Sequence, residues 1–488
     1  MIHNIRYRYI IFSVISLFFL IATTLHIRGY PLTSLPIHED ISISDPAPNV
    51  VPPPEPPKKA SYPKYKKEST SKASPIVDNF PLALAAHSAK DLPPIPAWNH
   101  PPKKHVDLQT PLFIGFTRNW RLLQQVVVSY ITAGWPPEDI YVVENTGVMD
   151  SNEKGKLSLQ NPFFVNYTRL HMFGVNIIRT PTLFSFAQLQ NFYIHTALEK
   201  KWATYFWSHM DVVTLSFEDR ILGLHPEIAD KPAESPPYES LYMNAVGYLR
   251  EALNGTDDAA RWALRFFHYD HLALVNVEAF MEIGAWDTMI PFYMTDCDMH
   301  ARLSMAKFDI KEVEAGIIFD VAASLDDLVV LYRKADTNIT ASFTDPNTLG
   351  KRMISAGEEE AIAGEVETRF VETLQQRSWF DSYWKDDKKW QDDKIGNEEG
   401  FLHLVHTLDA MVHSKSESKA GRNTWQGRQV GGKGEPFYRD SAGFEKAIQM
   451  TIEHGRAVFS EKWGHRDCDI REKGLVADDA WRVEHDWW

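Results

Sequence analysis

The sequence is poor in cysteine: its 488 residues contain only two, Cys297 and Cys468. Two cysteines are too few for a disulfide-rich scaffold or for a zinc module built on cysteine ligands, although one disulfide bond between them remains possible. Basic residues are also in the minority, since 51 Lys and Arg stand against 65 Asp and Glu, a formal net charge of −14. This balance argues against a nucleic-acid-binding surface, which would need a basic face.

An apolar run lies near the N-terminus, from Tyr9 to Leu25, and only serines and threonines interrupt it. At about 1.5 Å per residue it is long enough to cross a thin bilayer. Arginines precede it, which favours a cytoplasmic N-terminus. We therefore expect residues 1–8 to be a cytoplasmic tail and residues 9–27 a type II signal anchor. A cleaved signal peptide is the alternative, although the small-residue cleavage pattern is weak.

Either alternative places the bulk of the chain in the secretory lumen, and three Asn-x-Thr glycosylation triplets agree with this: they begin at Asn166, Asn254 and Asn338. Residues 28–108 are rich in Pro, Ser and Lys, a composition that cannot bury enough apolar surface to fold. We expect this segment to be a stem that holds a lumenal domain away from the membrane. The predicted location is a single-pass membrane protein of the Golgi or the ER.

From residue 109 to residue 325, short apolar runs alternate with helical patterns. The runs predict strands at Leu112–Thr117, Ile140–Val143, Val175–Ile178, Thr204–Trp207, Leu272–Val277 and, once or twice, within Phe308–Phe319. Helical spacing predicts helices at Arg121–Ala133, Ser185–Lys200, Leu241–Leu253, Ala259–Arg265 and Glu278–Ile283. This alternation indicates βαβ units and a mostly parallel sheet. No Gly-x-Gly-x-x-Gly follows the first strand, so the dinucleotide-binding fingerprint is absent.

Polar residues follow the first four predicted strands: Thr117 and Arg118, Glu144 and Asn145, Arg179, then His209 and Asp211. Because ligands of open α/β sheets bind at the carboxyl ends of the strands, we expect these side chains to converge on one site. His209 and Asp211 are two residues apart and share a face of an extended chain. An oxygen ligand there suits Mg²⁺ or Mn²⁺ bridging a diphosphate; the alternative is a turn with a solvated Asp.

The stretch from Trp286 to Leu303 is aromatic and apolar, and it ends in two carboxylates at the start of a helical pattern. Thr295 or Asp296 can cap this helix, and Asp298 can pair with Arg302 four residues later. An acidic pair at a helix mouth beside apolar residues is a favourable place for a catalytic base. The alternative is a capped helix with one ordinary ion pair.

The order of these parts resembles a nucleotide-diphospho-sugar glycosyltransferase of the GT-A fold, close in pattern to the large family 2 type. In that family a strand ends in a D-x-D motif, and a block of the form GGFDE…FF…EDVDLCLRL follows. His209-Met-Asp211 stands at the D-x-D position here, and Gly284–Asp287 with Pro291–Leu303 stands at the later block. The resemblance covers about Thr110 to Ala323.

The resemblance implies an α/β, Rossmann-like GT-A fold with a mixed, mostly parallel sheet flanked by helices. It implies transfer of a sugar from a nucleotide-sugar donor to a glycan or glycoprotein acceptor, with Mn²⁺ or Mg²⁺ as cofactor. Asp211 would then bind metal and diphosphate, and Asp296 would be the base of an inverting reaction. Asp298 and Arg302 would shape the helix.

The resemblance also places Thr117 and Asn145 beside the nucleotide, with Arg118 and Arg179 on the same strand ends. The chain departs from the family in two motif positions, since His209 replaces the first Asp of D-x-D and Thr295 replaces the Glu of the E-D pair. Asp320 stands where many relatives have a His near the metal, so we expect it as a further metal ligand.

Aromatic rings stack on sugars, so the acceptor side is expected at Trp286, His268, Tyr269 and His271; core packing is the alternative for these residues. After residue 325 we expect a mainly helical extension, 326–488, with helical patterns at Ala356–Gln376, Trp379–Asp393, Phe401–His413 and Phe444–Phe459. Its Gly-rich segment Arg422–Tyr438 has the composition of a lid loop. A disulfide between Cys297 and Cys468 would tie the end of this extension to the catalytic helix.

Two function classes compete with an active transferase. A catalytically silent protein could keep the GT-A fold and serve as a glycan-binding or scaffold protein. A metal-dependent hydrolase would use water as acceptor, but the sequence lacks the His and Asp cluster that such sites usually show. Donor turnover separates the transferase from the silent protein.

Overall fold

The computed structural model describes residues 63–65, 75–218, 238–255, 261–333, 339–345, 397–417, 431–435 and 441–487. The chain divides into two compact units, 1–70 and 71–488, and the helices and strands of the described part all belong to the second. The predicted signal anchor, the Asn338 triplet and the helices expected at 356–376 and 379–393 lie outside the described residues. None of the described helices combines the length and the apolar character that crossing a membrane requires.

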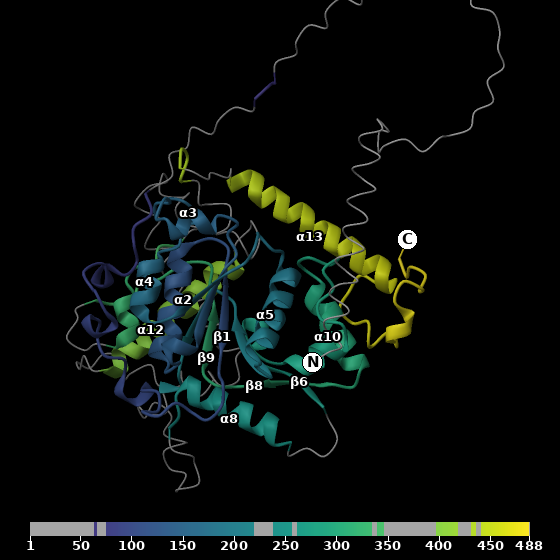
Figure 1. The fold of residues 1–488 in the computed structure, drawn as a ribbon, viewed down its shortest axis with the longest axis horizontal. Coiled ribbons are helices and arrows are strands. Elements are labelled where there is room, and N and C mark those ends of the chain that lie inside the picture. The colour runs from purple at the N-terminus through teal and green to yellow at the C-terminus, as the bar shows by residue number, and fades with distance from the viewer. Residues whose placement is uncertain are drawn as a thin grey trace, which may run out of the picture. The chain divides into compact units, whose positions relative to one another are not determined.

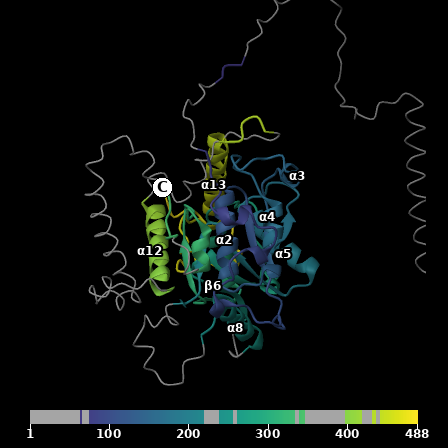
Figure 2. The same ribbon diagram turned by 90° about the vertical axis from the view of Figure 1, so that its left-hand side faces the viewer.

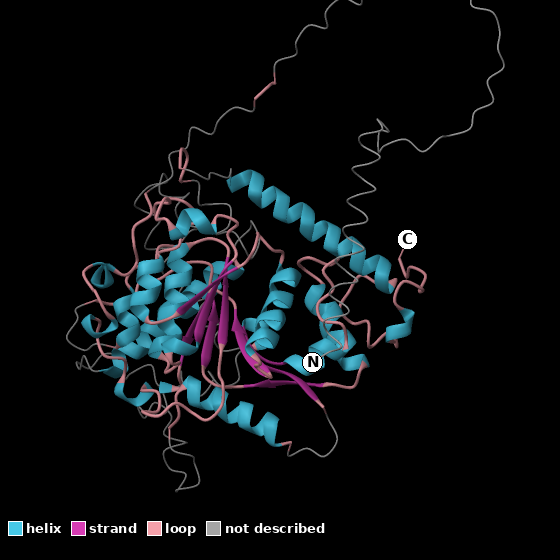
Figure 3. Cartoon of the chain, viewed as in Figure 1, coloured by secondary structure: helices cyan, strands magenta, loops and turns pink. Residues whose placement is uncertain are grey.

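The second unit is built on a seven-stranded sheet of order β3-β2-β1-β4-β7-β6-β8 (Figures 1 and 3). The strands are β1 (Leu112–Phe116), β2 (Ile140–Glu144), β3 (Asn176–Arg179), β4 (Thr204–Ser208), β6 (Trp262–Phe267), β7 (Leu272–Asn276) and β8 (Asp309–Val313). Strand β7 runs antiparallel to both of its neighbours, and the other pairs are parallel. A two-stranded antiparallel sheet joins β5 (Val212–Leu215) to β9 (Ile317–Asp320). This confirms the predicted α/β fold with a mixed, mostly parallel sheet.

Helices cover both faces of the sheet, which is why β1 is a nearly continuous apolar run rather than an alternating one. One core cluster joins the sheet to α2 (Trp120–Thr132), α8 (Leu241–Asn254) and α12 (Asn397–Ser416). The other joins it to α5 (Phe186–Lys200), α9 (Val277–Glu282) and α10 (Thr295–Met305). Figure 2 shows α12 and α5 on opposite sides of the sheet. The shorter helices α3 (Met149–Glu153) and α4 (Tyr167–Phe173) follow β2.

The close approach of α5 to β1 needs a glycine. A Cβ on Gly115 would lie 2.8 Å from the Leu189 side chain and would collide with the Tyr193 hydroxyl. Glycine in mid-strand normally weakens a strand, so its use here reflects this contact. Helix α5 itself begins with a capping box, in which Ser185 and Gln188 satisfy each other's backbone N–H groups.

Two predictions are wrong. Residues 28–108 were expected not to fold, but Phe80, Ala83 and Leu92 are buried in the main core cluster. The segment expected to be helical at Ala259–Arg265 forms strand β6, Trp262–Phe267, which pairs with β7 and β8. Its Ala, Leu and Arg residues favour a helix locally. In the sheet, however, the segment forms hydrogen bonds with β7 and β8 and most of its side chains are buried. Strand β5 was not predicted. Strands β1, β2, β3, β4 and β7 match the prediction to within one residue at each end.

The C-terminal region is helical, as expected, and α12 is part of the main core: Phe401, Leu404, Leu408 and Met411 are buried in the same cluster as β1 and α2. Helix α13 (Ser441–Trp463) instead packs its last turns against α10. Of the predicted lid, residues 431–435 are described, and Glu435 accepts hydrogen bonds there from Ser158 and Asn161.

Candidate active site

Three chain segments meet at the carboxyl edge of the sheet. His209 follows β4, the 3₁₀ turn Tyr269–His271 joins β6 to β7, and Asp320 ends β9. Because β7 is antiparallel to β4, its start lies beside the end of β4, and the His209 N–H donates to the His271 carbonyl at 3.1 Å. The β5–β9 pairing places Asp320 opposite Val212, next to Asp211. The predicted metal-ligand residues His209, Asp211 and Asp320 are therefore brought together.

Carboxylates and imidazoles alternate in this group. The His209 ring nitrogens lie 3.6 Å from Asp211 Oδ1 and 3.6 Å from Asp270 Oδ2. His271 Nε2 lies 3.6 Å from Asp320 Oδ1. We call these five residues, His209, Asp211, Asp270, His271 and Asp320, the strand-end cluster. The cluster has the acids and bases that a reaction with charged intermediates needs, held at contact distance.

A lysine from a distant part of the chain enters the strand-end cluster. Lys415 lies in the last turn of α12, and its Nζ is 2.8 Å from Asp211 Oδ2 and 2.5 Å from Asp320 Oδ1. Its side chain is only 7% exposed. The sequence pattern did not point to this residue, nor to Asp270. A lysine 204 residues after Asp211 belongs to no local motif.

The electrostatics of the cluster follow from burial and these contacts. Burial opposes charge on His209, but the carboxylates of Asp270 and Asp211 raise its pKa to about 10. Burial is likewise outweighed at Asp211, where Lys415 and His209 lower the pKa of the carboxyl. Asp211 and Asp320 raise the pKa of Lys415 against the same burial effect. These shifts favour the ionised forms of His209, Asp211 and Lys415, so cations and anions lie next to one another.

A divalent cation, which the resemblance implies, does not fit these side chains as they lie. A bridging Mg²⁺ needs oxygens at about 2.0–2.1 Å. Here the Lys415 ammonium already lies between the two carboxylates that would supply them. Within the described ranges, the ligand atoms that converge closely enough for an ion belong instead to His465, Asp467 and Asp469, in the C-terminal segment.

The predicted base, Asp296, lies half-buried in the first turn of α10. Its Oδ2 accepts a hydrogen bond from the Tyr269 hydroxyl at 3.1 Å. Tyr269 precedes Asp270 in the 3₁₀ turn, so it connects Asp296 to the strand-end cluster. His268 and Tyr269 have φ values of 71° and 51°, in the left-handed region that non-glycine residues avoid. Backbone strain of this kind concentrates at functional sites.

Helix α10 starts differently from the prediction. Its N-cap is Met294, with φ 74°, and neither Thr295 nor Asp296 caps it with a side chain. The predicted pair is present, because Arg302 Nε donates to Asp298 Oδ2 at 2.8 Å. The other guanidinium nitrogens of Arg302 donate to the carbonyls of Ile283 and Ala285. Arg302 therefore fixes α10 to the turn after α9.

Asp298 is fully buried and has two further partners, both on α13. Lys462 Nζ lies 2.7 Å from Asp298 Oδ1, and Trp463 Nε1 donates to the same oxygen at 3.0 Å. Lys462 also contacts Asp287 at 2.7 Å. The two helices are joined further by a disulfide bond from Cys297 to Cys468, just beyond α13, with Cα atoms 5.2 Å apart. The helix that carries Asp296 is thus held by the C-terminal region.

The segment after α13 contains a histidine enclosed by acids. The ring nitrogens of His465 lie 2.6 Å from Asp469 and 2.5 Å from Asp486. Burial opposes charge on this ring, but the two carboxylates raise its pKa above the ordinary 6.5. A raised native pKa stabilises the fold fully below pH 6.5, and the contribution is lost as the pH rises through the native value.

His465→Gln should therefore destabilise the protein at low pH and much less at high pH. The measurement is the melting temperature of both proteins at several pH values from about 5 to 9. We expect the gap between wild type and variant to be largest below pH 6.5 and to shrink above it. A gap that stays constant over this range would show that the ring is held by its shape rather than by its charge.

The residues predicted on the nucleotide side have protein partners. Arg118 is buried, its guanidinium is 3.0 Å from Glu445 of α13, and it lies over the Phe444 ring. The Asn145 amide bonds both the N–H and the carbonyl of Phe184, which fixes the loop before α5. Arg179 is exposed and pairs with Glu153 at 2.5 Å. Thr117 is half-buried at the end of β1.

Helix α13 contacts two widely separated parts of this edge. Its first turns meet Arg118, after β1, and its last turns meet Asp298, in α10. Figure 1 shows it crossing from the side of α3 to that of α10. With 23 residues it is about 34 Å long. It therefore spans the sheet edge on which the strand-end cluster lies.

Of the residues predicted on the acceptor side, Trp286 is buried and packs against Phe186 and Phe280. These contacts agree with core packing, the alternative given for this residue. His268 is exposed and stacks on His271 with ring centroids 5.2 Å apart. Among the glycosylation triplets, Asn254 is exposed at the end of α8, whereas the Asn166 side chain accepts from the Arg169 N–H as the N-cap of α4.

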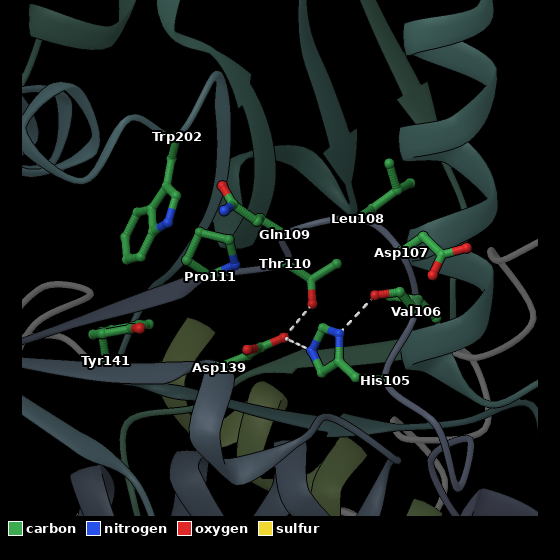
Figure 4. Close-up of a pocket in the computed structure, with 10 residues that line it drawn as sticks. All are labelled: His105, Val106, Asp107, Leu108, Gln109, Thr110, Pro111, Asp139, Tyr141 and Trp202. Carbon is green, nitrogen blue, oxygen red and sulfur yellow. Dashed lines mark hydrogen bonds and ion pairs between the residues drawn. The ribbon is translucent and has the colours of Figure 1, made fainter.

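A pocket of about 200 Å³ lies at the opposite, amino edge of the sheet (Figure 4). Its polar centre is Asp139, which accepts from Thr110 and lies 2.7 Å from His105 Nε2. Tyr141 and Trp202 form its apolar wall. Thr110 and Asp139 precede β1 and β2, so this pocket is separate from the strand-end cluster.

No protein-family model and no curated protein matches the chain. Solved structures that resemble it include a cytidylyltransferase from Leptospira borgpetersenii serovar Hardjo-bovis, at 10% identity over 42% of this chain and 76% of that one, with a TM-score of 0.25. The mannosyltransferase PcManGT from Pyrobaculum calidifontis, solved with GDP-Man and Mn²⁺, matches at 10% identity over 73% and 90%, with a TM-score of 0.25. TarS of S. aureus matches at 6% identity over 73% and 56%, with a TM-score of 0.27.

Proposed function

We propose that this chain is a glycosyltransferase that moves a sugar from a nucleotide-sugar donor to a hydroxyl of a glycan or glycoprotein acceptor. The observation that carries the proposal is the link between Asp296 and the strand-end cluster. The half-buried carboxylate of Asp296, at the start of α10, accepts a hydrogen bond from Tyr269. Tyr269 is the chain neighbour of Asp270, which belongs to the strand-end cluster. This group lies at the sheet edge where α/β proteins bind their ligands.

Each part has a physical role in such a transfer. An acceptor hydroxyl is a weak nucleophile, so Asp296 removes its proton as it attacks the anomeric carbon. The departing nucleoside diphosphate gains negative charge, and preorganised cations at the strand-end cluster stabilise it. His209 and Lys415 are such cations, because neighbouring carboxylates keep both protonated. With a carboxylate as base and no covalent intermediate, the anomeric configuration inverts.

The test is a panel of nucleotide sugars given to the purified full chain, with release of nucleoside diphosphate as the readout. We expect release with at least one donor, faster when an acceptor glycan is added, and an inverted anomeric centre in the product. A donor that binds will also raise the melting temperature, because it binds only the folded state. Release with no donor, together with no thermal shift, would support the silent glycan-binding protein instead.

We also propose that residues 9–27 anchor the chain as a type II protein of the Golgi or ER, with the catalytic unit in the lumen. Two features support this: the Cys297–Cys468 disulfide, which suits an oxidising compartment, and the exposed Asn254 triplet. Glycosidase treatment of the protein made in eukaryotic cells should increase its electrophoretic mobility. Asn254→Gln should reduce that shift. A mobility unchanged by glycosidase would oppose the lumenal location.

A further inference from the structure

Lys415 occupies an unusual position for a lysine, because its ammonium is buried between two carboxylates. Its ammonium contacts one oxygen each of Asp211, which directly precedes β5, and Asp320, which ends β9. These are the two carboxylates that the sequence pattern assigned to a metal ion. Two buried carboxylates so close together require a cation between them.

We propose that the Lys415 ammonium fills the position at which a divalent cation would join Asp211 and Asp320, so that the chain binds the diphosphate of its donor without a metal ion. This inference deepens the proposed function and rests on it for the identity of the ligand. An ammonium carries three N–H donors. Two point to the carboxylates, and among the described residues the third has no partner, which leaves it for a phosphate oxygen.

The lysine is held in place by its helix. Leu408 and Met411 of α12 are fully buried in the main core, and Ser414, next to Lys415, donates to Asp345 at 2.7 Å. The stem of Lys415 is itself buried. For a metal ion to enter, the ammonium would have to leave both carboxylates and the packed stem would have to move. An ion and the ammonium cannot share the position, since like charges at that distance repel strongly.

The other distances in the strand-end cluster also suit a lysine ammonium better than a divalent metal ion. The His209 and His271 nitrogens are 3.6 Å from the carboxylates, and no three ligand atoms of the cluster converge on one point within the part of the chain that the structure describes. Metal sites require such convergence at about 2.0–2.2 Å. The Lys415 Nζ distances of 2.8 Å and 2.5 Å to the two carboxylates are instead close to those of charge-assisted hydrogen bonds.

The experiment measures binding of Mn²⁺ alone to the full chain by the loss of the free-ion electron paramagnetic resonance signal. All proteins carry Asp469→Asn, because His465, Asp467 and Asp469 could bind Mn²⁺ on their own. In this background we expect no Mn²⁺ bound at the strand-end cluster. Lys415→Met should gain one site, and adding Asp211→Asn should weaken that site by about tenfold or more. Lys415→Arg, which keeps the charge, should gain none.

Turnover gives a second readout. The unmutated enzyme should be equally active with EDTA and with Mn²⁺, whereas Lys415→Met should be slow in EDTA and be partly restored by Mn²⁺. The proposal is overturned if protein with Lys415 intact binds one Mn²⁺ that Asp211→Asn removes, a result that does not depend on whether Lys415→Met folds. If no donor is turned over yet this Mn²⁺ result is negative, the proposed function fails while the assignment of Lys415 stands.

Discussion

Asp296→Asn is expected to slow sugar transfer by about 10²- to 10⁴-fold, the range that a positioned general base supplies. The amide has nearly the same shape but cannot take the proton of the acceptor hydroxyl. Tyr269 can still donate to the remaining carbonyl oxygen, so the turn and the start of α10 should keep their structure. The measurement is the single-turnover rate with a saturating donor and acceptor, beside the donor affinity, which should change little.

Glu312→Gln is the matched control. Glu312 is an exposed carboxylate that contacts the same residue, but through the Tyr269 backbone N–H at 3.1 Å rather than the hydroxyl. The rate of sugar transfer in Glu312→Gln should stay within about twofold of wild type. The reason is that Glu312 contacts Tyr269 only through the backbone and not through the hydroxyl that meets Asp296. If Asp296→Asn kept full activity, Asp296 would not be the base. If both variants lost activity equally, the turn would matter rather than the carboxylate.

Asp298→Ala is expected to destabilise the protein by about 3–5 kcal/mol, the cost of breaking a buried ion pair by removing one partner. Asp298 is fully buried, and its loss leaves Arg302 and Lys462 without the carboxylate they share. The indole N–H of Trp463 would lose its acceptor as well. Denaturant unfolding followed by circular dichroism measures the effect as a lower midpoint at an unchanged slope.

Asp287→Ala provides the comparison for this variant. Asp287 contacts the same Lys462 at 2.7 Å, but its side chain is 22% exposed, so water can replace the lost contact. We expect a cost of about 1 kcal/mol or less, typical of a solvent-exposed pair. Equal costs for Asp287→Ala and Asp298→Ala would contradict the role of burial. An Asp298→Ala protein as stable as wild type would mean that α13 is not needed to hold α10.

The accuracy of the sequence-based prediction depended on how local each feature is. Strands β1, β2 and β4 were predictable because a strand covered on both faces must be a continuous apolar run. Strand β6 was not, since what makes Trp262–Phe267 a strand is the presence of two neighbours made later in the chain. Local propensity gives way to such pairing whenever the segment is short.

The same distinction applies to the candidate site. His209, Asp211 and Asp296 were recognisable because strand ends and helix starts are local features with known positions in an α/β fold. Lys415 was not, because its place between Asp211 and Asp320 depends on how α12 packs, far along the chain. The family resemblance placed Asn145 beside the nucleotide, and only the structure shows that its amide bonds the Phe184 peptide. The position of a residue in the sequence predicts where it lies in the fold better than it predicts which group its side chain bonds.

The dependence of α10 on α13 has a consequence for how the protein is made. Cys468 leaves the ribosome 171 residues after Cys297, and Trp463 leaves it 165 residues after Asp298. At about 5–20 residues per second, this separation amounts to roughly ten to thirty seconds of translation. During that interval the nascent chain has the sheet and Arg302, but it lacks the remaining partners of Asp298. A premature stop before Lys462 would therefore yield a chain that has the strands of the sheet but lacks the residues that hold α10 in place.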